Sequence, residues 1–224
     1  TRKVVDEKTG EITEIPALAA DGQPAPKART EGGAEFAPTL PLMMDVAAGL
    51  QRHFDADELN EELIKIRRAL YFDLGVPFPG IQLRFNDALP ENTYLILLSE
   101  VPVSQGQLRP GYVLVRDTEQ NLQALQVPYT TDKPFLPGIP ALWTEASHVP
   151  MLAAAGIPCL DAHQILTWHL AFVLKKYSSD FIGIQETRFL LTAMEDRFPD
   201  LVKEALRVMP VQKLAEIMQR LVSE

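Results

Sequence analysis

The pattern of hydrophobic and polar positions changes twice along the chain. Residues 1–37 first alternate charges with Thr and Gly and then become rich in Ala, Gly and Pro, so they lack an apolar face. A stretch of this composition cannot bury enough apolar surface to offset the entropy lost on ordering. We therefore predict a flexible linker over residues 1–37, within which residues 3–13 could pair as a short hairpin.

The middle of the chain mixes the two periodicities of regular secondary structure. Residues 39–46 are apolar enough for a buried strand, and apolar positions at helical spacing predict a helix over residues 57–74. Short β-branched and aromatic runs between polar or Pro/Gly turns predict further strands. These strands are expected at 81–85, 94–103 and 112–116, with one more near 122–127 and a last short one at 141–144.

From residue 147 onward the pattern is helical throughout. Helices are expected at 147–155, 161–177, 184–198, 199–209 and 210–222. Pro199 and Pro210 fit the first turn of their helices, where the missing N–H is no loss. The last helix has an apolar face that needs a partner, so we expect the intact protein to continue beyond it. The order of linker, mixed region and helical region indicates an α+β protein.

Composition narrows the functional class. The 224 residues carry a formal net charge of −9, which argues against nucleic acid as a partner because phosphate binding needs clustered Lys and Arg. No apolar run is long enough to cross a membrane, so we expect a cytosolic fragment. The single cysteine, Cys159, excludes an intramolecular disulfide and a CxxC motif, and we predict that it is a small buried hydrophobe.

The sequence contains no recognisable arrangement for catalysis. No nucleophile elbow or phosphate-binding glycine loop is present, and Ser147 and His148 are adjacent in sequence and therefore diverge. His163 and His169 are six residues apart, which on a helix separates them by about 120°, so they cannot share a metal ion. We predict that the chain is not an enzyme and binds no cofactor and no metal.

Several segments are similar to motifs of one family. The most specific are Phe181-Ile-Gly-Ile-Gln-Glu-Thr187, Phe198-Pro-Asp-Leu-Val-Lys-Glu204 and Val211-Gln-Lys-Leu-Ala-Glu-Ile-Met-Gln-Arg-Leu221. Upstream, Gly75-Val-Pro-Phe-Pro-Gly-Ile81, Leu89-Pro-Glu-Asn-Thr-Tyr94 and Trp168-His-Leu170 follow in the expected order. Together they resemble the FHIPEP family of export-gate proteins of bacterial type III secretion, nearer its injectisome branch than its flagellar branch.

The resemblance implies a division of the chain into subdomains. Residues 1–37 correspond to the linker, residues 38–109 together with 162–181 to a small mixed-sheet subdomain one, and residues 110–161 to an inserted α/β subdomain two. Residues 182–224 correspond to the start of a helical subdomain three, which we expect to be truncated. The first subdomain of the family is described as thioredoxin-like. A redox enzyme is the weaker alternative, which the absence of a CxxC motif disfavours.

The family's function supplies the expected partners. By resemblance, the chain is a cytoplasmic docking platform that binds secretion chaperone–substrate complexes, a gatekeeper protein and other export-apparatus proteins, and that orders their export. The resemblance also implies that the protein self-associates into a ring, nonameric in described members, at the cytoplasmic face of the inner membrane. Contact with the membrane is expected only through the N-terminal half that this sequence lacks. The alternative is a purely structural ring-assembly module whose ligand sites lie in the missing C-terminal part.

The resemblance also points to three residues. In the flagellar branch, a chaperone-binding dimple between subdomains one and two uses an Asp and a Phe of a D-x-x-F stretch and a Thr-His pair on the following helix. The matching residues here are Asp132, Phe135 and Trp168, with Trp168 in the position of the Thr. We expect these three residues to bind partners. The alternative for Phe135 and Trp168 is ordinary core packing.

Overall fold

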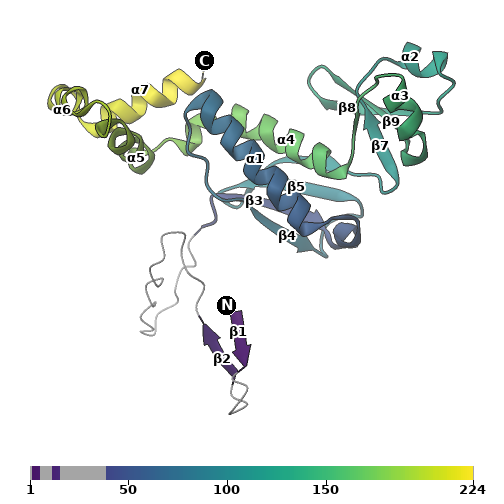
Figure 1. Ribbon diagram of the computed structural model, residues 1–224, viewed down its shortest axis with the longest axis horizontal. Helices are drawn as coiled ribbons and strands as arrows, with labels where there is room; N and C mark the ends of the chain where they lie inside the picture. The colour runs from purple at the N-terminus through teal and green to yellow at the C-terminus, as the bar shows by residue number, and fades with distance from the viewer. Residues whose placement is uncertain (1, 6–11, 16–38, 224) are drawn as a thin grey trace. The chain divides into compact units, whose positions relative to one another are not determined.

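The computed structural model describes residues 2–5, 12–15 and 39–223 (Figure 1). At the N-terminus, β1 (Arg2–Val5) and β2 (Ile12–Ile15) pair as an antiparallel hairpin, as the sequence predicted. The rest of the linker predicted over residues 1–37 lies outside the described residues. Residues 39 to 224 form a separate compact unit.

The first sheet of this unit is mixed. Its strand order is β4 (Gln82–Asn86), β3 (Leu42–Ala47), β5 (Thr93–Leu98) and β6 (Val101–Gln107). β3 runs parallel to β4 and antiparallel to β5, and β5 and β6 form an antiparallel hairpin. All six residues of β3 are buried, which agrees with the apolar run that predicted a strand here.

One long strand was expected over residues 94–103, and this prediction was wrong. The segment turns back on itself at Ser99 and Glu100, which both have a positive φ, and so makes the two strands β5 and β6. The turn contains neither Gly nor Pro, the residues that usually mark a reversal. Apolar residues on both sides of the turn therefore read as one continuous run in the sequence.

Two helices lie along one face of the first sheet (Figure 1). The first, α1 (Ala56–Leu74), follows a short 3-10 helix, η1 (Ala48–His53). Asp55 caps α1 by accepting hydrogen bonds from the N–H groups of Asp57 and Glu58, and Gly75 ends it with a φ of +68°. The second, α4 (Ala162–Lys176), begins with a capping box between Asp161 and Gln164.

The second sheet is antiparallel throughout. Its strand order is β10 (Cys159–Leu160), β7 (Tyr112–Val115), β9 (Ile139–Glu145) and β8 (Thr130–Leu136). Three short helices accompany it, namely α2 (Glu119–Ala124), η2 (Ala146–His148) and α3 (Val149–Ala154). The apolar side chains between the sheet and these helices form a small core of their own.

The strand predicted near residues 122–127 was also wrong, because the structure has the helix α2 there. Leu122 and Leu125 are three residues apart, a spacing that places both on one side of a helical turn. Asn121 also donates a hydrogen bond to the Asp117 carboxylate 2.8 Å away, which closes the first turn. Alternating apolar residues over so short a stretch fit either structure, and these local contacts favour the helix.

The two sheets share the larger hydrophobic core. Leu114, Trp143 and Leu160 of the second sheet belong to the same buried cluster as Met44 and Ile96 of the first. Burial of apolar side chains is the main stabilising contribution to folding, so a continuous cluster makes the two sheets depend on each other.

A buried polar network fixes α4 on the first sheet. The two ring nitrogens of His169 hydrogen-bond the Tyr94 hydroxyl and the Ser104 hydroxyl, each at 2.7 Å. Burial lowers the pKa of His169 to about 4, so the ring is neutral at pH 7, with one nitrogen donating and the other accepting. Burial likewise raises the pKa of the Tyr94 hydroxyl.

A second polar group is buried within the sheet itself. The Asp45 carboxylate of β3 accepts hydrogen bonds from Arg84 Nε at 2.8 Å and Nη2 at 2.6 Å, and from Asn86 Nδ2 at 3.1 Å. Burial alone would raise the pKa of Asp45, but the hydrogen bonds and charge of Arg84 and the amide of Asn86 outweigh it and lower the pKa. This bidentate pair joins β3 to β4.

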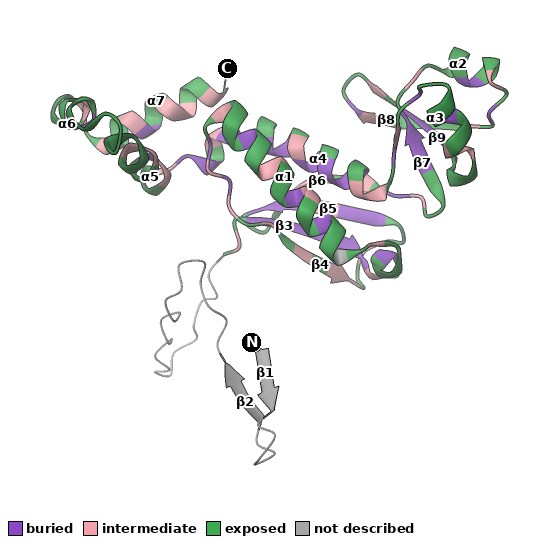
Figure 2. Cartoon of the chain, in the orientation of Figure 1, coloured by how far each residue is buried: buried purple, intermediate pink, exposed green. Residues whose placement is uncertain are grey.

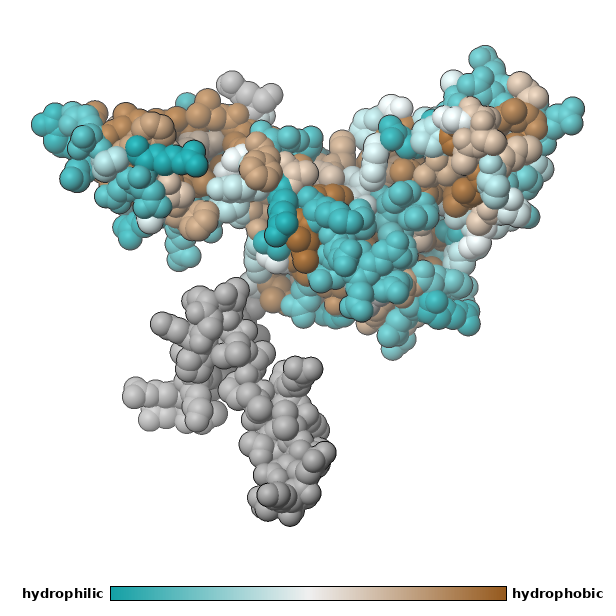
Figure 3. Space-filling model, in the orientation of Figure 1, coloured by the Kyte–Doolittle hydropathy of each residue, from teal (hydrophilic) through white to brown (hydrophobic). Residues whose placement is uncertain are grey.

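The chain ends in a helical region made of η3 (Ser178–Phe181), α5 (Ile184–Glu195), α6 (Pro199–Val208) and α7 (Val211–Ser223). The Ser178 hydroxyl donates to the carbonyl of Val222 at 3.0 Å, which joins η3 to α7. Apolar side chains gather on the surface over α6 and α7 (Figure 3). In the described residues, no helix combines the length and the apolar character needed to cross a membrane.

We predict that acid weakens the fold through His169. Its pKa is about 4 when folded and about 6.5 when unfolded, so between these values only the unfolded chain binds the proton. The stability that the neutral imidazole contributes is complete above pH 6.5 and is lost as the pH falls towards 4. The free energy of unfolding should therefore fall by about 2 kcal/mol between pH 7 and pH 5. Urea unfolding at the two pH values checks this.

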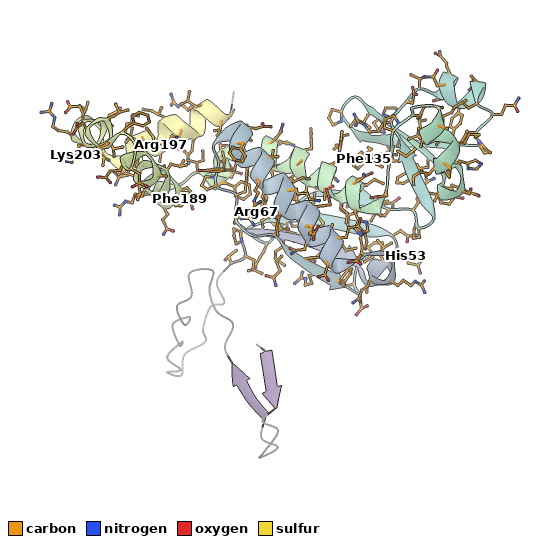
Figure 4. All side chains as sticks on the ribbon, viewed as in Figure 1. His53, Arg67, Phe135, Phe189, Arg197 and Lys203 are labelled. Carbon is orange, nitrogen blue, oxygen red and sulfur yellow. The ribbon has the colours of Figure 1, made fainter. Side chains whose placement is uncertain are left out.

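Two variants separate His169 from the other titrating groups. In His169→Gln the free energy of unfolding should change less between pH 7 and pH 5 than in the wild type. His53→Gln replaces an exposed histidine (Figure 4). In this variant the free energy of unfolding should change between pH 7 and pH 5 as much as in the wild type. The same pH dependence in His169→Gln and in the wild type would contradict the assignment.

We predict that Gly106→Ala is destabilising. Gly106 faces Tyr94 across the β5–β6 pair, and a Cβ at this position would overlap the Tyr94 ring and hydroxyl. Because the ring is buried and hydrogen-bonded to His169, it has little room to move, and overpacking of this kind costs about 1–3 kcal/mol. Thermal unfolding measures the effect. Gly80→Ala is the control, since its Cβ meets nothing within 4 Å.

Candidate partner-docking site

The first predicted site residue, Asp132, lies on the edge strand β8. Its carboxylate accepts a hydrogen bond from Arg109 Nη2 at 2.9 Å, and the side chains of both residues are partly exposed. Arg109 also donates to the Thr130 hydroxyl at 2.9 Å, and its guanidinium lies 5.4 Å from the centre of the Trp143 ring. Asp132 is therefore a surface charge held in place by a neighbour.

The second residue, Phe135, lies near the tip of the β8–β9 hairpin. The pairing shifts register between Asp132 and Leu136, and Gly138 turns the chain with a φ of +78°. The half-buried ring of Phe135 packs against the main core, with its centre 5.7 Å from that of His169 in an edge-to-face arrangement. The hairpin tip lies close to α4 (Figure 4). Phe135 thus joins the second sheet to the first.

The third residue, Trp168, lies on the solvent side of α4 with 36% of its surface exposed. Core packing is therefore wrong for this tryptophan. The Arg116 guanidinium, just beyond the end of β7, stacks 4.0 Å from the centre of the indole ring. Such a cation–π pair at an exposed site contributes about 0.5–1 kcal/mol.

The structure brings two of the three predicted residues to one part of α4. Phe135 contacts His169, which directly follows Trp168 in the chain. Asp132 lies on the same strand as Phe135 but is engaged by Arg109. Sequence analysis missed Arg109 and Arg116, because a pairing between residues distant in the chain leaves no local pattern.

The described residues offer little for chemistry. Ser104 and His169 lie at the distance of a nucleophile and its base, but both imidazole nitrogens already hold hydroxyl partners. With a pKa of about 4, His169 is also a weak base. Within residues 39–223, no group of three His, Cys, Asp or Glu side chains could hold a metal ion. Burial raises the pKa of the half-buried Cys159 thiol, which disfavours the reactive thiolate.

Apart from this site, the structure has an apolar cavity of about 610 Å³ between the end of α1 and the helices α5 and α7. Tyr71 and Leu74 line it from α1, and Met194, Phe198 and Leu221 contribute from the helical region. Its lining offers apolar contact area and one cation, Arg197, but no cluster of titratable groups. The cavity is thus suited to packing against another apolar surface.

The chain is similar to proteins of known sequence and structure from other bacteria. It is 44% identical to "Low calcium response locus protein D" of Yersinia pestis over 223 residues, which cover 94% of this chain and 32% of that protein. The chain therefore spans about a third of the length of the curated relatives that it matches. The CdsV protein of Chlamydia pneumoniae, 34% identical, has a similar structure, with a TM-score of 0.78 over 85% of this chain and 59% of that one.

A second solved structure is the complex of CdsV with CdsO from the same organism. It is 35% identical to the chain, with a TM-score of 0.78, and the match covers 84% of this chain and 56% of that one. The model of the FHIPEP family matches residues 4–224, nearly the whole sequence. The chain therefore belongs to the FHIPEP family, and it is similar to members of the injectisome branch.

Proposed function

We propose that this chain is the cytoplasmic docking platform of a type III secretion export gate. In this role it binds secretion chaperone–substrate complexes and gatekeeper proteins and orders their export. Family membership supports the general role, and the complex of CdsV with CdsO supports partner binding by a relative of this fold. The whole protein is then placed at the cytoplasmic face of the inner membrane, and its membrane contact is made by parts outside this sequence.

The exposed face of Trp168 is the observation that carries the docking role. A large aromatic side chain that remains partly open to solvent is typical of a binding anchor. Phe135 packs against His169, the residue that follows Trp168 on α4. Pro134 and Pro137 restrict the chain on either side of Phe135, so little entropy is lost when a partner binds. Asp132 supplies a charge near the rim that can orient the partner.

The apolar surface of the helical region favours a second function, assembly of the ring. Phe189 on α5, Leu201 on α6 and Leu221 on α7 are each more than half exposed. Exposed apolar area of this extent is typical of surfaces that bind another protein segment. On this second proposal, the helical region serves self-association, and the division into three subdomains separates docking from assembly.

We predict that Asp132→Ala weakens partner binding without unfolding the protein. The Asp132–Arg109 pair is exposed, so its loss should cost at most about 1 kcal/mol of stability. A charge that orients a partner contributes more, and we expect the affinity for a purified chaperone–substrate complex to fall about tenfold. Thermal unfolding and calorimetric titration measure the two effects. Asp87→Ala, at an exposed turn, is the control.

Phe135→Ala separates docking from packing. The ring is half-buried against the core and contacts His169, so its removal should cost about 2 kcal/mol of stability in addition to any loss of affinity. Binding is therefore measured well below the melting temperature of the variant. Wild-type affinity in both Asp132→Ala and Trp168→Ala would refute the docking function, whereas concentration-dependent self-association alone would favour the assembly role.

A further inference from the structure

The charge of α4 differs from that of the rest of the chain. The whole sequence has 30 acidic and 21 basic residues, yet α4 contains no Asp and no Glu between Ala162 and Lys176. Its only charged side chains at neutral pH are Lys175 and Lys176 in the last turn. This helix is therefore a locally basic surface on an acidic protein.

The solvent side of α4 also carries two aromatic side chains. Trp168 is 36% exposed and Phe172 is 37% exposed. Four residues apart, they lie next to each other on one side of the helix, and Lys175 continues the same side one turn further. Exposed residues recur along this side of α4, opposite the buried residues that face the sheet (Figure 2).

Arg116 adds a cation from the second sheet. Its guanidinium stacks 4.0 Å from the centre of the Trp168 ring, so the apolar surface has positive charge at both ends. We call the surface formed by Arg116, Trp168, Phe172 and Lys175 the α4 strip. The guanidinium stacked on the indole, rather than the ring itself, can donate hydrogen bonds to a carboxylate of a partner.

The cations of the strip are available to a partner. Lys175 Nζ lies 3.7 Å from an Asp73 carboxylate oxygen, but both side chains are more than half exposed, so the pair is screened and weak. The helix dipole also favours lysine in the last turn, and this effect is enough to explain Lys175 and Lys176. The dipole explains neither the two solvent-facing aromatic residues nor the stacking of Arg116.

We propose that the α4 strip binds an acidic amphipathic helix of a partner protein. The inference rests on the proposed docking function and defines the chemistry of that partner. Apolar side chains of the helix would bury Trp168 and Phe172, and its carboxylates would pair with Arg116 and Lys175.

Two synthetic peptides test the proposal on the full chain. One is an amphipathic helix with a leucine face flanked by glutamates, and the other has lysines in place of the glutamates. Trp168 reports binding by fluorescence, because Trp143 is only 4% exposed. We expect the glutamate peptide to bind at least about tenfold more tightly than the lysine peptide at low salt, with the difference shrinking as salt is added. Equal affinities would overturn the proposal.

Matched variants locate the binding surface. Phe172→Ala should weaken binding of the glutamate peptide by roughly tenfold or more, and Lys175→Gln by a few-fold. Val101→Ala on β6 removes an exposed apolar side chain elsewhere, and Lys203→Gln on α6 removes an exposed lysine elsewhere (Figure 4). Both variants should leave the affinity unchanged. All of these side chains are exposed, and thermal unfolding confirms that each variant is folded. Wild-type affinity in Phe172→Ala would contradict the assignment.

A further comparison distinguishes this proposal from the docking function on which it rests. The double variant Phe172→Ala/Lys175→Gln and the single variant Asp132→Ala are each titrated with a chaperone–substrate complex. Loss of binding in both supports the strip as part of the docking site. Loss of binding in Asp132→Ala alone would overturn the proposal that the α4 strip binds the partner, and it would leave the docking function standing. Peptide binding on the strip without any binding of the complex to the wild type supports the strip and refutes the docking function.

Discussion

The hydrogen bonds of His169 determine where the rest of the structure can lie. The imidazole joins α4 to β5 through Tyr94 and to β6 through Ser104. His169 and Tyr94 are buried, and Ser104 is partly buried. A buried histidine without both partners would leave a polar group unsatisfied, so the helix has one favourable position on the sheet. The same position of α4 also places the His169 ring against which Phe135 packs. The location of the second sheet on α4 therefore depends on the same side chain.

The elements with strong periodicity could be predicted from the sequence. The helix α1 has apolar residues at helical spacing together with Asp55 and Gly75 at its ends, and β3 is a short apolar run. The errors fell where the pattern was short or where the turn residues were unusual. At α2, side-chain hydrogen bonds favoured a helix, and at Ser99 the chain reverses without Gly or Pro. Hydrophobic periodicity reveals neither the hydrogen bonds at α2 nor the chain reversal at Ser99.

The candidate site was predictable only in part, and for a different reason. Resemblance to a family supplied Asp132, Phe135 and Trp168, but it said nothing of their neighbours in this chain. Arg109 and Arg116 reach the site through contacts between segments that are far apart in the sequence. The exposure of Trp168 depends on how far the second sheet covers α4, and this is a property of tertiary packing. Such features require the folded structure.

The pairing of β7 with β10 has a consequence for how this protein can change. The chain enters the second sheet at β7 and leaves it at β10, and Leu114 and Leu160 are direct neighbours in the antiparallel register. Entry and exit points that lie side by side let the intervening segment lengthen, shorten or be exchanged without moving the strands and helices that precede and follow it. The loops of the second sheet can therefore change in length or sequence while the first sheet and its helices keep one geometry.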